Sequence, residues 1–172
     1  MNVSSFMKEK RDLYDLNKNL TNEVINKGDI IPKNRKMLVV AIWIEDLNGK
    51  FLVQKRKKGE FWSITSGHPK AGETSLEGIL TEAKEELNLD ISNCDIKLID
   101  CSSDELHFID LYYVKMDIDL NKLILQQEEV IDVKLVSLEE ISDLIKNKQF
   151  FTYHIEKFEK LLDYKNIKLL KI

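Results

Sequence analysis

The stretch SGHPKAGETSLEGILTEAKEELNLDI, residues 66–91, combines a loop rich in glycine and proline with one amphipathic helix. Thr74 is a good N-cap residue, and Glu77 three positions later completes a capping box, so a helix is predicted over residues 75–88. The apolar side chains of this helix recur at spacings of three and four and share one face; they are Leu76, Ile79, Leu80, Ala83 and Leu87. The stretch therefore predicts a loop followed by a helix that packs on a core.

Three glutamates, Glu82, Glu85 and Glu86, occupy positions i, i+3 and i+4 of the predicted helix and form one acidic ridge, well rotated from the apolar face. Like charges at this spacing repel each other, at a cost of roughly a few tenths of a kcal/mol per pair. A hard divalent cation offsets this repulsion, because Mg²⁺ prefers oxygen ligands and is often shared with substrate phosphates. A solvated acidic face is the alternative, since glutamate-rich helix faces are common. The glycine-rich loop before the helix favours the metal site, because it lets backbone approach a ligand closely.

The segment resembles the Nudix box, Gly-x5-Glu-x7-Arg-Glu-U-x-Glu-Glu-x-Gly-U, where U is apolar. The residues in register are Gly67, Glu73, Glu82, Ala83, Glu85, Glu86 and Leu89. The flanks DLYDLNKNLTNEV, LVVAIWIEDLNGKFLVQKR and EEVIDVKLVSLEEI are similar to the Nudix branch related to isopentenyl-diphosphate isomerase. We therefore expect one Nudix-like domain over residues 1–172, with a β-hairpin extension at 1–30 and the box at 67–89.

The resemblance implies an α+β fold, an α/β/α sandwich with a mixed central sheet. It implies that Glu82, Glu85 and Glu86 bind Mg²⁺ or Mn²⁺, and that water attacks a phosphorus of a nucleoside-diphosphate-like substrate. The residue that activates this water stays open between these glutamates and the pair Glu128 and Glu129. That pair precedes a predicted strand and is otherwise a solvated acidic loop.

Two positions depart from the family pattern. The box arginine is Thr81, which cannot orient a carboxylate by a salt bridge as that arginine does. Lys84 or a lysine elsewhere would have to substitute, and lysine lacks the bidentate geometry of arginine. The box glycine is Asn88, a milder change, because asparagine tolerates the left-handed conformation that ends a helix.

His68, in the run Ser66-Gly67-His68-Pro69, is a candidate contact of substrate phosphate or metal, with an ordinary loop histidine as the alternative. The isomerases have Cys-Gly-His-Pro here, and a serine is a poor proton donor or acceptor compared with a thiol. Isomerase activity is therefore disfavoured. Glu105 and His107 match the isomerase metal-binding acids only partially, and we interpret them as edge residues or substrate contacts.

The basic run at residues 55–58 follows a predicted strand, and Lys55 and Arg56 are candidate ligands of substrate phosphates. A solvated turn is the alternative interpretation. Four aromatic side chains near this run could stack on a base, although buried aromatic residues are more common than stacking platforms; they are Trp43, Phe51, Phe61 and Trp62.

The remaining elements follow from periodicity and turn signals. Strands are predicted at 37–46, 51–56, 61–65, 95–101, 107–117 and 130–137, and two short strands in 8–27 surround a turn at Asn17–Asn19. Asn48-Gly49 is a strong hairpin signal between the strands at 37–46 and 51–56, and 66–73 is predicted as loop. A second capping box, Ser137 with Glu140, opens a helix at 137–148. A last amphipathic helix is predicted at 151–164, with one apolar face made of Phe151, Ile155, Phe158, Leu161 and Leu162.

Composition limits the other function classes. The 172 residues suit one domain, and the net charge of −4 argues against a general nucleic-acid binder. No apolar run approaches the ~20 residues that span a bilayer, and the acidic N-terminus lacks the apolar core of a signal peptide. The two cysteines are typical of free thiols in a reducing cytosol.

We thus expect a cytoplasmic enzyme with a small-molecule diphosphate substrate, no polymeric nucleic acid and no membrane partner, whose oligomeric state is open and includes a homodimer among the options. The first hypothesis is a divalent-metal-dependent pyrophosphohydrolase in which Glu82, Glu85 and Glu129 are the catalytic candidates. The alternatives are an isomerase-like enzyme and a non-catalytic nucleotide-binding protein.

Overall fold

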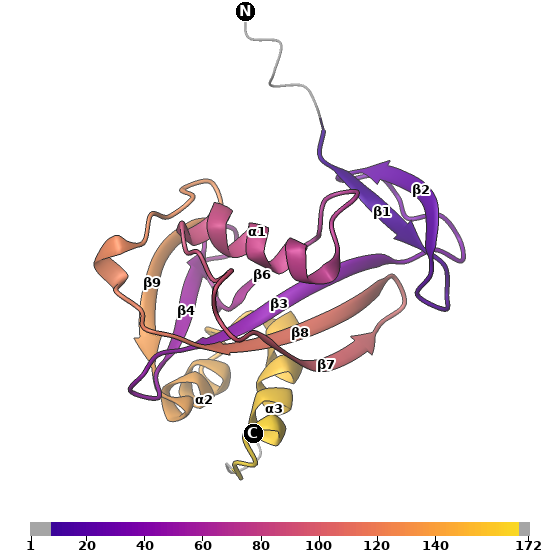
Figure 1. The fold of residues 1–172 in the computed structure, drawn as a ribbon. Coiled ribbons are helices and arrows are strands. Elements are labelled where there is room, and N and C mark those ends of the chain that lie inside the picture. Colours follow the sequence, from indigo (N-terminus) through magenta and orange to yellow (C-terminus); the bar gives the residue numbers. More distant parts are fainter. Residues whose placement is uncertain (1–7, 169–172) are drawn as a thin grey trace, which may run out of the picture.

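The computed structural model describes residues 8–168 as a mixed β-sheet with helices on both faces (Figure 1). The strands are β1 (Lys10–Tyr14), β2 (Leu20–Asn26), β3 (Met37–Glu45), β4 (Phe51–Arg56), β5 (Trp62–Ser63), β6 (Thr65–Gly67), β7 (Lys97–Ser103), β8 (His107–Lys115) and β9 (Val130–Val136). The helices are α1 (Ser75–Leu87), α2 (Leu138–Lys146) and α3 (Ile155–Tyr164), with short 3₁₀ turns η2 (Leu120–Lys122) and η3 (Thr152–His154). Helix α1 lies on one face of the sheet and α2 and α3 lie on the other, which confirms the predicted α/β/α sandwich.

Strand β3 organises the sheet because three different strands pair with it. It runs parallel to β8 over its whole length, from Met37 opposite His107 to Glu45 opposite Lys115. It pairs with β4 at one position, Glu45 opposite Phe51, and the two strands then diverge. Strand β6 fills the resulting gap by pairing with residues 40–42 of β3.

The parting of β3 and β4 corrects two predictions. The predicted turn is present, since Asp46 accepts backbone hydrogen bonds from Asn48 and Lys50, but the strands that leave it do not form a long hairpin. The segment 61–65, predicted as one strand, is split between β5 and β6, and residues 66 and 67, predicted as loop, belong to β6. Serine and glycine have low strand propensity, so the pairing with β3 overrides the local preference here.

Alternating residues of β3 supply two separate cores. Val40, Ile42 and Ile44 face α1, whereas Ala41 and Trp43 face α2 and α3. Because both faces of β3 are covered, the strand is apolar almost without interruption, as expected for a central strand.

Helix α1 has the predicted ends. Both hydrogen bonds of the Thr74–Glu77 capping box are present, and Asn88 ends the helix in the left-handed conformation at φ 53° and ψ 34°. One residue of the predicted apolar face is misplaced: Leu76 is 44% exposed, because contacts with the core begin only at the second turn, at Ile79. The second predicted capping box, at the start of α2, also has both of its hydrogen bonds.

The hairpin of β1 and β2 lies at one end of the sheet (Figure 1), with the two strands flanking the predicted turn at residues 17–19. Its tip is anchored by the Lys18 ammonium, 2.6 Å from the buried Asp110 carboxylate of β8. The Ser75 hydroxyl donates to the other oxygen of Asp110 at 2.6 Å, which joins the hairpin, β8 and the start of α1. The hairpin is therefore held in place over the end of the sheet.

The last helix begins later than predicted. Phe151 donates its backbone N–H to the carbonyl of Trp62 at 2.8 Å, and Phe150 forms a parallel bridge with the same residue. These bonds keep residues 150–151 extended beside β5, so Phe151 is not helical and α3 starts at Ile155. None of the helices in residues 8–168 is both long enough and apolar enough to cross a membrane.

Candidate active site

A cavity of about 670 Å³ lies where α1, the divergent part of the sheet, the N-terminal hairpin and the η3 turn meet. Six of the residues predicted for the site line this cavity: Arg56, His68, Glu82, Glu85, Glu86 and Glu129. His107 and Ser66 line it as well. Lys55, Glu105 and Glu128 are not among its lining residues.

Lys55 was a predicted phosphate ligand, and the structure places it outside the cavity. Successive side chains of a strand point to opposite faces, so Lys55 and Arg56 cannot both face the cavity. The ammonium of Lys55 lies over the Trp62 ring at 5.8 Å, and that of Lys134 lies over the same ring at 4.2 Å. Arg56 shares its face of β4 with Gln54, and both line the cavity.

The three glutamates of α1 have different surroundings. Glu86 is 9% exposed and Glu82 is half-buried, so the ridge borders the apolar face of the helix, contrary to the predicted separation. Burial, together with the neighbouring carboxylates of Glu86 and Glu85, raises the pKa of Glu82 to about 8. Burial also raises the pKa of Glu86, to about 7, although a hydrogen bond from Gln54 acts against the shift. Glu85 is exposed and forms an ion pair with Lys70.

A buried hydrogen-bond chain fixes the position of Glu86. The Thr65 hydroxyl donates to the amide oxygen of Gln54 at 2.8 Å, and the Gln54 amide nitrogen donates to Glu86 at 2.6 Å. The hydroxyl bond fixes which way the Gln54 amide points, so its N–H is directed at the carboxylate. Sequence reasoning missed Gln54, although its place two residues before Arg56 on one strand was an available signal.

Thr81, expected to be unable to orient a carboxylate by a salt bridge, orients Glu73 by a hydrogen bond. The Thr81 hydroxyl donates to one oxygen of Glu73 at 2.5 Å, and the backbone N–H of Lys70 donates to the other at 2.6 Å. The ammonium of Lys70 meanwhile pairs with Glu85. Thr81 and Lys70 thus hold the carboxylates of Glu73 and Glu85, a role in which the family pattern has an arginine. Lys84 is exposed and takes no part in these contacts.

Gly67 allows the carboxylate of Glu82 to lie directly against the backbone of β6. A Cβ atom added at Gly67 would lie 2.2 Å from Cδ of Glu82, far inside contact distance. In residues 8–168 no three acidic, imidazole or thiol side chains converge on one ligand position. The donor set nevertheless fits a hard cation, because it consists of three carboxylates, and burial disfavours the ionised form of two of them, Glu82 and Glu86.

His68 has an imidazole that is neutral at physiological pH. Burial, together with the positive charges of Arg11 and Lys27 and the nearby ring of His107, lowers its pKa to about 3. Its Nε2 is buried and has no hydrogen-bond partner in the described part of the chain. Arg11 and Lys27 come from the hairpin and line the cavity, which sequence reasoning did not predict.

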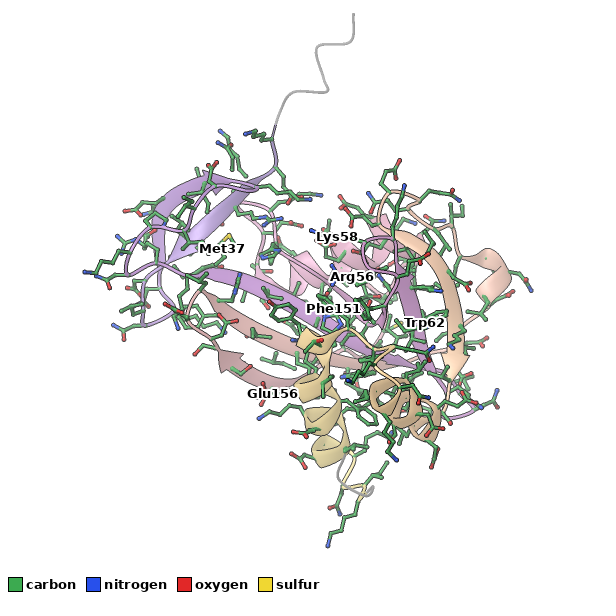
Figure 2. The ribbon with its side chains drawn as sticks, turned by 180° about the vertical axis from the view of Figure 1, so that it is seen from behind. Met37, Arg56, Lys58, Trp62, Phe151 and Glu156 are labelled. Carbon is green, nitrogen blue, oxygen red and sulfur yellow. The ribbon has the colours of Figure 1, made fainter. Side chains whose placement is uncertain are left out.

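The other wall of the cavity is aromatic and basic. The Arg56 guanidinium lies 3.6 Å above the Phe151 ring, and Figure 2 shows the two side chains next to each other. His154 and Tyr153 of η3 also line the cavity and were not predicted. Of the aromatic residues considered for stacking, Trp43 and Phe51 are fully buried in the core.

Comparison with known proteins agrees with this geometry. The sequence profile of the NUDIX domain matches residues 35–157. The chain belongs to the Nudix hydrolase family. An uncharacterised Nudix hydrolase of Listeria innocua is 33% identical over 153 residues, which are 84% of this chain and 89% of that protein. The dihydroneopterin triphosphate diphosphatase of Escherichia coli is 30% identical over 73 residues, 42% of this chain and 49% of the diphosphatase.

The fold of this Nudix hydrolase is also found in a crystal structure of DR0079 from Deinococcus radiodurans. The TM-score is 0.74 at 19% identity, with 88% of this chain and 98% of that chain covered. At this identity the likeness concerns the fold alone.

The raised pKa values of Glu82 and Glu86 predict an unusual pH dependence of stability. Between about pH 4.5 and 8 the folded chain binds more protons than the unfolded chain, so the unfolding free energy of the metal-free protein falls as the pH rises. We expect the melting temperature in EDTA to fall more steeply from pH 5 to pH 8 in the wild type than in Glu82→Gln, by roughly several degrees. Glu128→Gln, at an exposed site outside the cavity, should keep the wild-type slope. Equal slopes in all three proteins would contradict the assignment.

The contact between Gly67 and Glu82 predicts the effect of one methyl group. Gly67→Ala should fold, because the clash is with a side chain that can move, but it should displace the Glu82 carboxylate. We expect Mn²⁺ affinity to fall roughly 10- to 100-fold, as for other residues that support metal ligands. Isothermal titration with Mn²⁺ measures this, with far-UV circular dichroism as the check on folding. Ser66→Ala is the matched control, and unchanged Mn²⁺ affinity in Gly67→Ala would refute the prediction.

Proposed function

We propose that this Nudix hydrolase is a divalent-metal-dependent enzyme that cleaves a diphosphate linkage in a nucleoside-diphosphate-like or related small molecule. The observation that carries the proposal is the cavity in which Glu82, Glu85 and Glu86 share one space with the Arg56 guanidinium. Glu82 and Glu86 have raised pKa values, so a bound cation would stabilise their ionised forms strongly. A guanidinium beside them suits phosphate oxygens, which it binds with two parallel hydrogen bonds.

In this proposal Glu82, Glu85 and Glu86 hold Mg²⁺ or Mn²⁺. When bound, such an ion neutralises negative charge on the phosphoryl oxygens and lowers the pKa of coordinated water. Gln54 holds Glu86 in place, and Lys70 limits the movement of Glu85. These two contacts pre-organise the ridge, which reduces the rearrangement needed when a ligand enters.

Substrate phosphates are assigned to Arg56 and His68. The guanidinium is planar and permanently charged, and its stacking on Phe151 leaves its N–H edge free to meet two oxygens at once. His68 is neutral, so it contributes one hydrogen bond and no charge. Lys55 has no part in this assignment because it lies outside the cavity.

The proton of the attacking water has three candidate acceptors, Glu82, Glu85 and Glu129. Glu129 is exposed, lines the cavity and forms no side-chain ion pair in residues 8–168. A positioned general base contributes roughly 10²- to 10⁴-fold to the rate. Separate Glu→Gln variants at the three positions distinguish them, because loss of the base lowers kcat while loss of a ligand also weakens metal binding.

The substrate is taken to be a small molecule in the cytoplasm. The relative that acts as a dihydroneopterin triphosphate diphosphatase supports a compound with linked phosphates. Nucleotide sugars, dinucleotide polyphosphates, oxidised nucleotides and isoprenoid diphosphates form the test panel. Release of phosphate or diphosphate, with Mg²⁺ and with Mn²⁺, identifies the substrate, and no release from any member with either ion would refute the proposal.

Glu86→Gln is the central prediction for this function. Its amide oxygen still accepts the Gln54 hydrogen bond, so the fold should persist while the carboxylate charge is lost. We expect metal-dependent turnover of the substrate found in the panel to fall by roughly 10³-fold or more, in line with the loss of a catalytic group. Glu128→Gln is the matched control and should keep full turnover. Turnover by Glu86→Gln at the wild-type rate would remove Glu86 from the mechanism.

The isomerase alternative has one observation on its side: Ser66 lines the cavity beside Gly67 and His68. The position agrees with the resemblance to the isomerase branch, but a serine hydroxyl is a poor acid or base near neutral pH. Incubation with isopentenyl diphosphate, followed by analysis for its isomer, tests this alternative directly. The non-catalytic alternative rested on Thr81, and the contacts of Thr81 and Lys70 reduce its support.

A further inference from the structure

The η3 turn presents a large aromatic ring to the cavity. Tyr153 lines the cavity and is 74% exposed, and its ring centroid lies 5.3 Å from that of the half-buried Phe151. Val39 of β3 and Ile109 of β8 add apolar surface to the same space. This end of the cavity therefore offers flat and apolar contacts, in contrast to the carboxylates of α1.

The backbone of the turn is held at several points. His154 donates its backbone N–H to the carbonyl of Phe151 at 2.9 Å, and the Lys157 ammonium donates to the carbonyl of Tyr153 at 2.9 Å. Phe151 is itself bonded to Trp62, next to β5. Tyr153 is thus exposed on a turn whose position is fixed. Stacking of a ligand on Tyr153 therefore costs little conformational entropy of the backbone.

The hydrogen bonds of His154 determine where its proton lies. The backbone N–H of Ile64 can only donate, and it donates to Nδ1 of His154 at 3.3 Å. Nδ1 is therefore unprotonated, and the proton of the neutral ring is on Nε2. Burial lowers the pKa of His154, and the charges of Lys157 and Arg56 act in the same direction, so the ring stays neutral. We find no partner for Nε2 within residues 8–168, and His154 lines the cavity.

We propose that Tyr153 and His154 determine substrate specificity by binding a planar heteroaromatic ring, with Tyr153 stacking on the ring and the Nε2–H of His154 donating to a ring acceptor. This inference rests on the proposed function, and it selects a base-bearing diphosphate over an aliphatic one. An isoprenoid chain would meet the apolar surface but would cover the Nε2–H of His154, which borders the cavity, without offering it an acceptor. Such an unpaired donor is what allows a polar site to reject a substrate that lacks the matching group.

Arg56 connects the two ends of the cavity. Its guanidinium stacks on Phe151 next to the ring subsite (Figure 2). Arg56 also lies on the same face of β4 as Gln54, which contacts Glu86. A ring at Tyr153 and a diphosphate at the glutamates would therefore both lie beside Arg56. One extended substrate thus fills the cavity from end to end.

Binding of non-hydrolysable probes tests the inference. The probes are methylenediphosphonate itself and its esters with adenosine, guanosine, cytidine and isopentenol, titrated by calorimetry in Mg²⁺. We expect at least one nucleoside ester to bind about tenfold or more tightly than the isopentenyl ester, because one base–aromatic stack supplies that much affinity. Tyr153→Ala should remove most of this gain and Tyr153→Phe should keep it, while the affinity for methylenediphosphonate stays unchanged in both.

His154→Asn isolates the donor, because asparagine retains an acceptor for the Ile64 N–H and lacks the distal N–H. We expect this variant to bind the nucleoside ester more weakly than the wild type does and to bind the isopentenyl ester with unchanged affinity. Tyr164→Ala, an exposed tyrosine on α3 outside the cavity lining, is the matched control. An isopentenyl ester that binds as tightly as every nucleoside ester, or a Tyr153→Ala variant that weakens all probes alike, would overturn the inference. Failure of methylenediphosphonate to bind at all would instead count against the proposed function.

Discussion

Strands β3 and β4 leave their connecting turn as partners and separate after one paired position, and the site exists because of that separation. Where β4 separates from β3, the backbone N–H and C=O groups on that edge of β3 need another partner, because unpaired backbone groups inside a sheet cost free energy. Strand β6 provides this partner through residues 65–67. The pairing places Gly67 against the carboxylate of Glu82 and so brings the start of the loop, the acidic ridge and the open face of β4 to one place. A fully paired hairpin would close this space.

The cavity holds carboxyl groups whose ionised forms the protein alone stabilises poorly. Glu82 and Glu86 lie partly out of water beside each other, and burial raises the pKa of both. The contacts around them orient the carboxylates more than they neutralise them, as the neutral Gln54 amide shows. Lys70 pairs with Glu85, the most exposed of the three, whereas in residues 8–168 Glu82 and Glu86 form no ion pair. A site arranged in this way is less stable when empty and gains stability from a cation, which is the property expected of a metal-binding ridge.

Local sequence signals predicted most helices and strands, whereas the way they pair depends on contacts between residues far apart in the sequence. The capping box at Thr74, the left-handed Asn88 and the apolar run of β3 each act through neighbours in the sequence, and all three are found as predicted. The assignment of residues 66 and 67 to β6 depends on a partner some 25 residues away, and no local signal indicated it. The error over Lys55 was of a different kind, because strand alternation applied to residues 54–56 would have separated it from Arg56.

Some residues of the cavity could not have been found by any local argument. His154 is a buried histidine whose Nδ1 accepts a hydrogen bond from the backbone of Ile64, 90 residues earlier, so its tautomer depends on a contact that only the folded chain forms. Tyr153 lies within residues 151–164, which were predicted as one α-helix, whereas the structure places it in the 3₁₀ turn η3, where its side chain takes a different direction. Thr81 was interpreted as a loss because the arginine it replaces acts by charge, whereas the structure uses a hydroxyl for Glu73 and a separate lysine for Glu85.

Segments on both sides of the Nudix box in the sequence complete the cavity. The family profile covers residues 35–157, yet Arg11 and Lys27 of the hairpin line the cavity from outside that range. The hairpin is tied to the domain through Lys18 and Asp110, so these two basic side chains are held over the space and are not free to leave it. The η3 turn, near the far end of the matched range, supplies the aromatic wall. Side chains from outside the box thus form a large part of the cavity, which is why the box residues alone predict a reaction and not a substrate.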